Sequence, residues 1–216
     1  RGISARGIIG LRLNTKSSAS VNGQYVQILK GTQLQIKNNG FPYFLNFDSD
    51  FIRLEKTNRG FVNVELVQGE VETQNFSGSG AALQSYNLTT KEGTDHNLVT
   101  VKVDGESYEI VDSLYDMNAN SKACLVKTSI TGGLAVFFGN GQFGTMPPVG
   151  STIIISYVKT RGSGGNIGGK GIQFDFKDAG TDQSGERVDL NEILSINIVR
   201  SPNFGSNSED PTFTRL

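Results

Sequence analysis

Hydrophobic and polar residues alternate with a period of two along much of this chain. Thr32–Lys37 carries Leu34 and Ile36 on one face with polar residues between them, and Phe61–Val67 alternates in the same way. Because successive side chains of a strand point to opposite faces, this spacing predicts β-strands with one buried face. The same reasoning predicts further strands over residues 24–30, 98–103, 107–111, 123–129, 134–138, 151–160, 172–176 and 193–200.

Helical periodicity is scarce by comparison. Only Val111–Met117 has the local character of a short helical turn. A long apolar stripe with a period of 3.6 residues is missing from the sequence, which argues against βαβ units and a parallel sheet. We therefore predict a mainly β fold of antiparallel, β-sandwich-like sheets with little helix.

The strongest local signal is a turn at Asp104-Gly105. Val99, Val101 and Val103 alternate with polar residues before it, and a second alternating run follows it. Asp-Gly between two such runs is typical of a type I′ hairpin, because both central residues of that turn need a positive φ. The sequence therefore predicts a tight hairpin with Asp104 and Gly105 at its tip.

Two Gly/Ser clusters, Ser77–Gly80 and Gly162–Gly165, divide the strand-like sequence. Each is flanked by predicted strands, so we interpret them as crossings between two subdomains. We expect a discontinuous β domain of residues 1–70 and 162–216. Residues 71–161 then form an inserted β domain, which carries the hairpin and a Gly- and Pro-rich loop.

Charge and composition exclude several classes of function. Twenty Lys and Arg against 21 Asp and Glu give a net charge of −1, so bulk charge gives no reason to bind nucleic acid or an anionic membrane. One Cys and one His disfavour a disulfide framework and most metal sites. The apolar runs are far shorter than the roughly 20 residues of a membrane span. The chain opens on Arg1 without a signal-peptide pattern, which indicates a piece of a longer protein.

One glycine motif is similar to a nucleotide-binding fingerprint. Gly139–Gly144 fits G-x-G-x-x-G after a predicted strand, but Pro147 and Pro148 follow it. A dinucleotide site needs a helix there, whose N-terminal amides hold the pyrophosphate. Proline removes amide donors and disfavours helix in the preceding residue. We interpret Gly139, Gly141 and Gly144 as a structural turn, in which each glycine is expected to have a positive φ, and we expect no cofactor.

The remaining polar candidates are weak. Asp48-Ser49-Asp50 has the spacing of a hard-cation pair, but it lacks the rest of a calcium loop and is typical of a solvated turn. Asp175, Asp178 and Asp182 form a sparser cluster of the same kind. His96 lies in a polar stretch that predicts a turn, and Cys124 lies in an apolar run that predicts a buried thiol. We therefore expect no metal site and no catalytic residues.

One long stretch resembles a known family. Residues 136–157 followed by Gly162–Ile167 are similar to the "FGDG-x-x-G-x-x-P-x-G" to "GG-x-x-GN" passage of the baseplate J-like and baseplate wedge proteins of contractile phage tails. Shorter similarities precede it in the family's order at Leu29–Thr32, Leu66–Glu70 and Val103–Gly105, and Ser208–Asp210 is similar to an element near the family's end. Asn140 stands where the family has Asp.

The resemblance implies a structural protein of the virion, assembled in the host cytoplasm. A wedge component bridges the central hub and the sheath, binds other wedge subunits and copies of itself, and takes part in the baseplate rearrangement on contraction. The sequence leaves two rivals: a carbohydrate-binding or adhesin-like β domain, and a polysaccharide-degrading enzyme. The absence of Trp and the six Tyr count against the first, and no sequence feature beyond scattered carboxylates favours the second.

The best local candidate for an interface is the aromatic and proline-rich stretch around the glycine motif. Interfaces have apolar, aromatic-rich centres, and a stiff backbone loses little conformational entropy on docking. The alternative is that these side chains fill their own core, since adjacent strand residues point to opposite faces. We expect Phe143 to be the most exposed at the loop tip. The candidate set is Phe137, Phe138, Phe143, Met146, Pro147 and Pro148.

Overall fold

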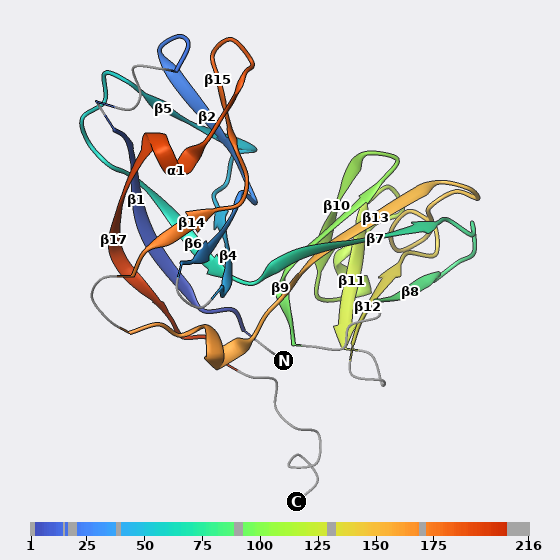
Figure 1. The fold of residues 1–216 in the computed structure, drawn as a ribbon. Helices are drawn as coiled ribbons and strands as arrows, with labels where there is room; N and C mark the ends of the chain where they lie inside the picture. Colours follow the sequence, from blue (N-terminus) through green and yellow to red (C-terminus); the bar gives the residue numbers. More distant parts are fainter. Residues whose placement is uncertain are drawn as a thin grey trace, which may run out of the picture. The chain divides into compact units, whose positions relative to one another are not determined.

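A computed structural model of the chain describes residues 3–14, 16, 21–37, 40–88, 93–128, 133–168 and 172–206. It is mainly β with antiparallel sheets and little helix, as predicted (Figure 1). One sheet is a half-barrel and another is nearly closed into a barrel, which the sequence did not predict. The chain divides into two compact units. The first, which we call the inserted unit, contains Val71–Thr160; the second, which we call the split unit, contains Ser4–Glu70 and Arg161–Ser206.

The inserted unit is a seven-stranded sheet that curves into a nearly closed barrel. Its outermost strands approach each other, since the Tyr86 hydroxyl donates to the Ser77 carbonyl at 2.8 Å and the Tyr86 ring packs on Phe76. The barrel core is aliphatic and aromatic, with Phe138 and Tyr157 at its centre. The strands run in the order β7 (Glu70–Ser77), β13 (Thr152–Lys159), β9 (Thr94–Val103), β10 (Glu106–Val111), β11 (Ala123–Thr128), β12 (Leu134–Phe138) and β8 (Ser85–Leu88).

One pair in this barrel runs parallel, contrary to the antiparallel expectation. Ile110 of β10 pairs with Cys124 of β11 in the same direction. The connection between the two strands contains the short 3-10 helix η2 (Leu114–Asp116), where a helical turn was predicted. The Ser113 side chain accepts from the Tyr115 N–H and Asp116 accepts from the Ser113 N–H, which forms a capping box. The connection is too short to show a helical periodicity in the sequence, so the pattern of residues did not predict this parallel pair.

The split unit packs two sheets over one core. Ile9, Leu11 and Leu66 from the larger sheet meet Val26 and Ile28 from the smaller one in a single buried cluster. The six-stranded half-barrel has the order β14 (Phe174–Phe176), β3 (Gln33–Ile36), β4 (Pro42–Asn46), β6 (Val62–Gln68), β1 (Arg6–Leu13) and β17 (Leu194–Asn203). The four-stranded sheet has the order β16 (Arg187–Val188), β15 (Gly180–Asp182), β2 (Tyr25–Leu29) and β5 (Phe51–Glu55).

Two short helical segments complete the described part of the split unit. The 3-10 helix η3 (Gly162–Gly165) forms at the second Gly/Ser cluster, and α1 (Leu190–Ile193) precedes β17. Ile193 was expected to begin the last strand and lies in α1 instead, because Asp189 caps a helical turn there through the Asn191 N–H. The first Gly/Ser cluster, Ser77–Gly80, was interpreted as a crossing, but it lies inside the inserted unit, where Gly78 packs against Pro148 and Ser151.

The predicted hairpin is confirmed. Asp104 has φ 50° and Gly105 has φ 84°, and Val103 pairs with Glu106 across the turn. These are the positive angles that a type I′ turn requires at both central positions. The hairpin therefore joins β9 and β10 as the sequence indicates.

Candidate functional site

The glycine- and proline-rich segment forms a loop of residues 139–151 between β12 and β13, which we call the Gly-Pro loop. Its first part is organised by the Asn140 side chain, whose oxygen accepts from the N–H groups of Gln142 and Phe143 at 3.0 and 2.8 Å. The Gly141 N–H donates to the Gly144 carbonyl at 3.0 Å. These bonds satisfy the turn internally and hold it in one conformation.

Glycine is required at the three positions of the motif for two different reasons. Gly141 and Gly144 have φ 87° and 77°, where other residues are strained. Gly139 was predicted to need a positive φ as well, and this is wrong. It is required because the loop folds back over it, so that a Cβ there would overlap the carbonyl oxygens of Phe143 and Gly144. No helix follows within residues 145–151, so the loop offers no helix N-terminus for a phosphate.

The Gly-Pro loop is anchored by a buried glutamine. Gln84, 7% exposed, donates from Nε2 to the Pro147 carbonyl at 2.9 Å. Its Oε1 accepts from the Ser79 N–H at 2.9 Å and lies 2.7 Å from the Tyr86 hydroxyl, whose one proton it shares with the Ser77 carbonyl. One side chain thus ties the loop to the chain before β8 and to the barrel wall.

A second anchor lies on the crossover between β10 and β11. The Gly144 N–H donates to the Asn118 carbonyl and the Thr145 N–H donates to the Ser121 carbonyl, both at 2.9 Å. Met117 lies beneath Gly144, where a Cβ would meet its sulfur. The loop is therefore fixed from two sides.

The phenylalanines of the candidate set divide between core and surface. Phe138 is fully buried in the barrel and Pro147 is also buried, so these two candidates present no side chain to a partner. Phe137 is half-buried against a small cluster around Met117. Phe143 is half-buried in the same cluster and is not an exposed tip, because the loop folds over the crossover instead of protruding.

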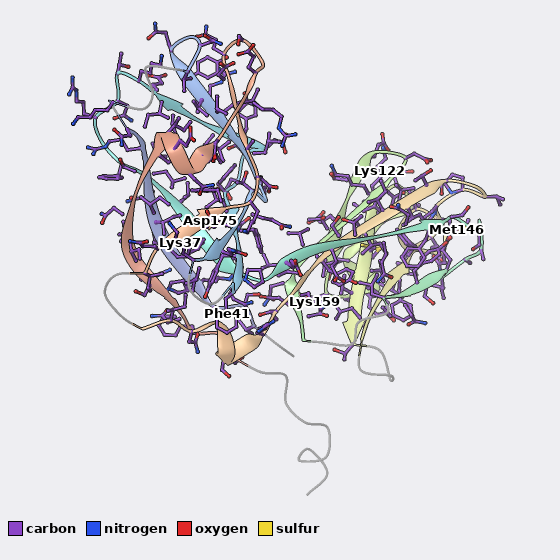
Figure 2. All side chains as sticks on the ribbon, in the orientation of Figure 1. Lys37, Phe41, Lys122, Met146, Lys159 and Asp175 are labelled. Carbon is purple, nitrogen blue, oxygen red and sulfur yellow. The ribbon has the colours of Figure 1, made fainter. Side chains whose placement is uncertain are left out.

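The exposed apolar groups lie beside these residues. Tyr115 is 86% exposed and meets the Phe143 ring edge-on, with centroids 5.8 Å apart. Val149 is 80% exposed, Met146 is 39% exposed (labelled in Figure 2), and Pro148 is exposed. Sequence reasoning missed Tyr115 and Val149, although Tyr115 lies in the predicted helical turn. We call the set of Tyr115, Phe143, Met146, Pro148 and Val149 the loop surface.

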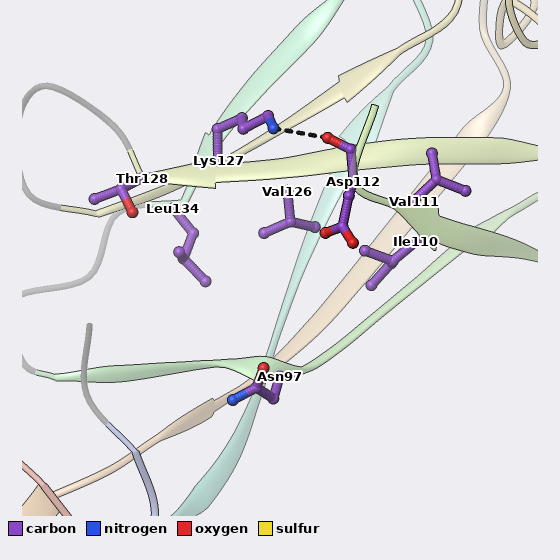
Figure 3. Close-up of a pocket in the computed structure, with 8 residues that line it drawn as sticks. All are labelled: Asn97, Ile110, Val111, Asp112, Val126, Lys127, Thr128 and Leu134. Atoms are coloured by element: carbon purple, nitrogen blue, oxygen red, sulfur yellow. Dashed lines mark hydrogen bonds between the residues drawn. The ribbon is translucent and has the colours of Figure 1, made fainter. Parts of the chain in front are cut away.

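A cavity of about 320 Å³ opens in the inserted unit where β9 and β10 diverge (Figure 3). Its described lining is mixed, with Ile110, Val126 and Leu134 beside Asn97, Asp112, Lys127 and Thr128. The Lys127 ammonium donates to the Asp112 backbone carbonyl at 2.9 Å, as the dashed line in Figure 3 marks. Among the described residues of the lining there is one carboxylate, that of Asp112, whereas glycoside hydrolysis uses a pair across the scissile bond.

The acidic candidates lie in or next to turns of the split unit. Asp48 and Asp50 lie exposed in the bend between β4 and β5. Asp175 forms an ion pair with Lys177 at 3.3 Å, and Asp178 accepts from the Gln33 N–H at 2.7 Å. Within the described residues, no group of three or more His, Cys, Asp and Glu side chains is arranged to hold a metal ion.

Asp182 is the most heavily bonded of these carboxylates. Its Oδ1 accepts from the Ser184 hydroxyl at 2.6 Å and from the Glu186 N–H at 3.0 Å, and its Oδ2 accepts from the Asn22 N–H at 3.0 Å. These hydrogen bonds, the Ser184 hydroxyl first, lower the pKa of Asp182 against the opposing effect of burial. The carboxylate therefore organises the turn between β15 and β16.

His96 and Cys124 lie on strands of the inserted unit. His96 was expected in a turn, but β9 begins at Thr94, because Thr94 and Asp95 continue the pairing with β13 past a bulge. Cys124 is fully buried, and burial raises the pKa of its thiol to about 12. A thiol held neutral in this way is a poor nucleophile and packs as a small apolar group.

Among the helices of the described segments, none has the length and apolar character of a membrane span. No known family model matches the chain, and no curated protein matches it.

Proposed function

We propose that this chain is a structural component of a contractile-tail baseplate wedge. In this proposal it acts in the virion without catalysis, connects the hub region to the sheath, and takes part in the rearrangement on contraction. The resemblance of residues 136–167 to baseplate wedge proteins carries the proposal. The loop surface is its contact with other wedge subunits or with copies of the chain.

The geometry of the Gly-Pro loop supports this role. The loop is fixed by the Asn140 and Gln84 side chains and by backbone bonds to Asn118 and Ser121. A loop held in one shape before docking loses little conformational entropy when it binds. Tyr115, Met146 and Val149 provide the aromatic and apolar groups that interface centres contain.

Incorporation into particles tests the proposal. Mass spectrometry of purified contractile-tail particles should detect the protein that contains this chain. The double variant Tyr115→Asp/Val149→Asp should fold and fail to enter particles, because it places charge on the two most exposed residues of the loop surface. Leu29→Asp is the matched control, since Leu29 is 56% exposed and lies in the split unit; it should assemble. Absence of the protein from particles, or normal assembly of the double variant, would contradict the proposal.

One observation favours a second candidate, a carbohydrate-binding domain. Tyr115 is 86% exposed, and aromatic faces at the surface are the usual platforms for sugar rings. A glycan array with the wild-type chain and with Tyr115→Ala separates the two candidates. Signals that disappear in the variant would favour glycan binding over assembly.

A further inference from the structure

The six-stranded half-barrel of the split unit has two outer strands that are paired on one side only. Among the described residues, β14 pairs with β3 alone and β17 pairs with β1 alone. A cavity of about 270 Å³, which we call the seam, is lined by residues of both strands and of α1. The two strands and α1 are labelled in Figure 1. The apolar lining of the seam consists of Ile172, Phe174, Leu190, Leu194, Ile196 and Ile198.

The backbone of β14 has one edge turned toward the seam. The Lys37 N–H donates to the Gln173 carbonyl and the Lys177 N–H donates to the Gln33 carbonyl, both at 2.9 Å. Residues 173, 175 and 177 therefore bond to β3, and by alternation the N–H and C=O groups of Phe174 and Phe176 point the other way. Those two residues form the free edge.

One side chain already bonds to that edge in the manner of a strand. The Asn191 carboxamide accepts from the Phe176 N–H at 2.7 Å and donates to the Phe176 carbonyl at 3.0 Å. This is the pair of bonds that a neighbouring strand would make. The next residue on the same edge, Phe174, makes no such bond to a described residue.

β17 presents a matching edge. The Asn14 N–H donates to the Ile193 carbonyl at 2.7 Å, so residues 193, 195 and 197 face β1. The backbone groups of Ile196 and Ile198 then face the seam, and neither bonds there to a described residue. Ile196 and Ile198 also turn their side chains into the seam, whereas Val199 is 51% exposed.

Both ends of the seam are defined. At one end the Leu194 N–H donates to the Leu190 carbonyl of α1. At the other end the Ile167 N–H donates to the Pro202 carbonyl at 2.8 Å. The open stretch of β17 between these bonds has the length of a short strand.

We propose that the seam accepts an extended segment of a partner protein, which adds a strand between β14 and β17. Free backbone edges recognise another backbone, and a long edge strand is a template for pairing. The apolar lining selects apolar side chains at alternate positions. Two charged residues line the seam, Lys37 and Asp175, and both are labelled in Figure 2. Asp175 is paired with Lys177, whereas Lys37 has no ion pair to any described residue. The partner segment therefore carries a carboxylate near Lys37.

A second copy of the chain is a less suitable occupant of the seam than a segment of another protein. Each strand among the described residues already belongs to one of the three sheets, so the described part of a copy has no free strand to donate. An extended segment of another protein that forms no strand before it binds does not have to leave a sheet in order to pair in the seam. The seam also lies in a different unit from the loop surface, so this proposal can fail without affecting the proposed function, and the reverse holds too.

The test uses the intact chain and a displayed library of peptides about six residues long. The library has Val, Ile or Leu at alternate positions, Thr or Ser between them, and Glu at one end. The tightest peptide is synthesised and its affinity is measured by fluorescence anisotropy. Methylation of alternate backbone nitrogens in the peptide should weaken binding at least about tenfold, because it removes the donors to one strand edge.

Variants of the protein place the binding site. Ile196→Lys should weaken binding at least about tenfold, whereas Asn197→Lys, on the opposite face of the same strand, should leave it unchanged. Lys37→Ala should weaken binding about two- to fivefold, as expected for an exposed ion pair. Should Ile196→Lys fail to fold, the methylated peptide decides, because that measurement needs only the wild-type protein.

Four results would overturn the proposal. The library could yield no binder, or the methylated peptide could bind as well as the parent. Asn197→Lys could weaken binding as much as Ile196→Lys does. Sedimentation could show that the chain self-associates and that Ile196→Lys abolishes this, which would make a second copy the occupant.

Discussion

Asp104 and Thr152 bond to each other through two groups. The Asp104 N–H donates to the Thr152 carbonyl at 2.9 Å, and the Asp104 carboxylate accepts from the Thr152 N–H at 2.8 Å. The tip of the β9–β10 hairpin is thereby attached to the start of β13. The conformation of the turn thus affects three strands at once.

Gly105→Val should destabilise the chain by about 1–3 kcal/mol, because φ at this position is 84° and a β-branched residue is strained there. Urea denaturation measures the change. Ser107→Val is the control, since Ser107 is exposed in β10 and valine suits a strand. Equal stabilities of the Gly105→Val variant and the parent would contradict the type I′ assignment.

Gln84→Ala should cost about 1–3 kcal/mol, because it leaves the Pro147 carbonyl and the Ser79 N–H without their buried partner. Hydrogen exchange should also become faster across the Gly-Pro loop. Gln142→Ala, at an exposed position of the same loop, should change stability by less than about 0.5 kcal/mol. If both variants behave alike, Gln84 does not anchor the loop.

Phe143→Asp should destabilise the inserted unit by about 2 kcal/mol, because it removes a half-buried ring and places a charge in the cluster around Met117. Tyr115→Asp should cost no more than about 1 kcal/mol, since it loses a single edge-on ring contact at the surface. Thermal unfolding of the two variants compares them directly. If Phe143→Asp leaves the midpoint of thermal unfolding unchanged, this ring faces solvent.

Asp182→Asn tests the linkage between pH and stability. The folded-state pKa of Asp182 is lowered, so its carboxylate stabilises the fold at pH values above the unfolded pKa of about 3.9. That contribution is lost as the pH falls from there through the folded-state pKa. Denaturation at several pH values should therefore show wild type more stable than Asp182→Asn at neutral pH, with the gap closing in acid. A gap that is independent of pH would rule out this linkage.

Period-two patterning predicted the strands whose inward residues are apolar, such as β3 and β6. It missed β7, because the half-buried positions of that strand include Glu72 and Gln74, whose side chains bond to the Tyr157 hydroxyl at 2.8 Å. It also missed β1, where Gly7 and Gly10 interrupt the pattern. Close packing against Pro202 and Phe61 leaves no room for a side chain at these two positions.

The candidate site was predictable as a rigid loop but not in its orientation. The glycine and proline spacing indicates a tight turn with a stiff exit, and the loop has both. Whether Phe143 points outward depends on what lies beneath it, and that is the crossover with Met117 and Tyr115. A contact of this kind is set by the tertiary fold, so local sequence carries no signal for it.

The parallel pair of β10 and β11 requires a particular connection between the two strands. β10 and β11 are consecutive in the sequence and run in the same sense, whereas strands that are joined by a tight hairpin turn run in opposite senses. The chain therefore has to return along the barrel before β11, and the connection through Ser113 and Tyr115 makes that return. A two-residue hairpin in its place would reverse β11 and every strand that pairs through it, so a hairpin cannot replace this connection without changing the topology.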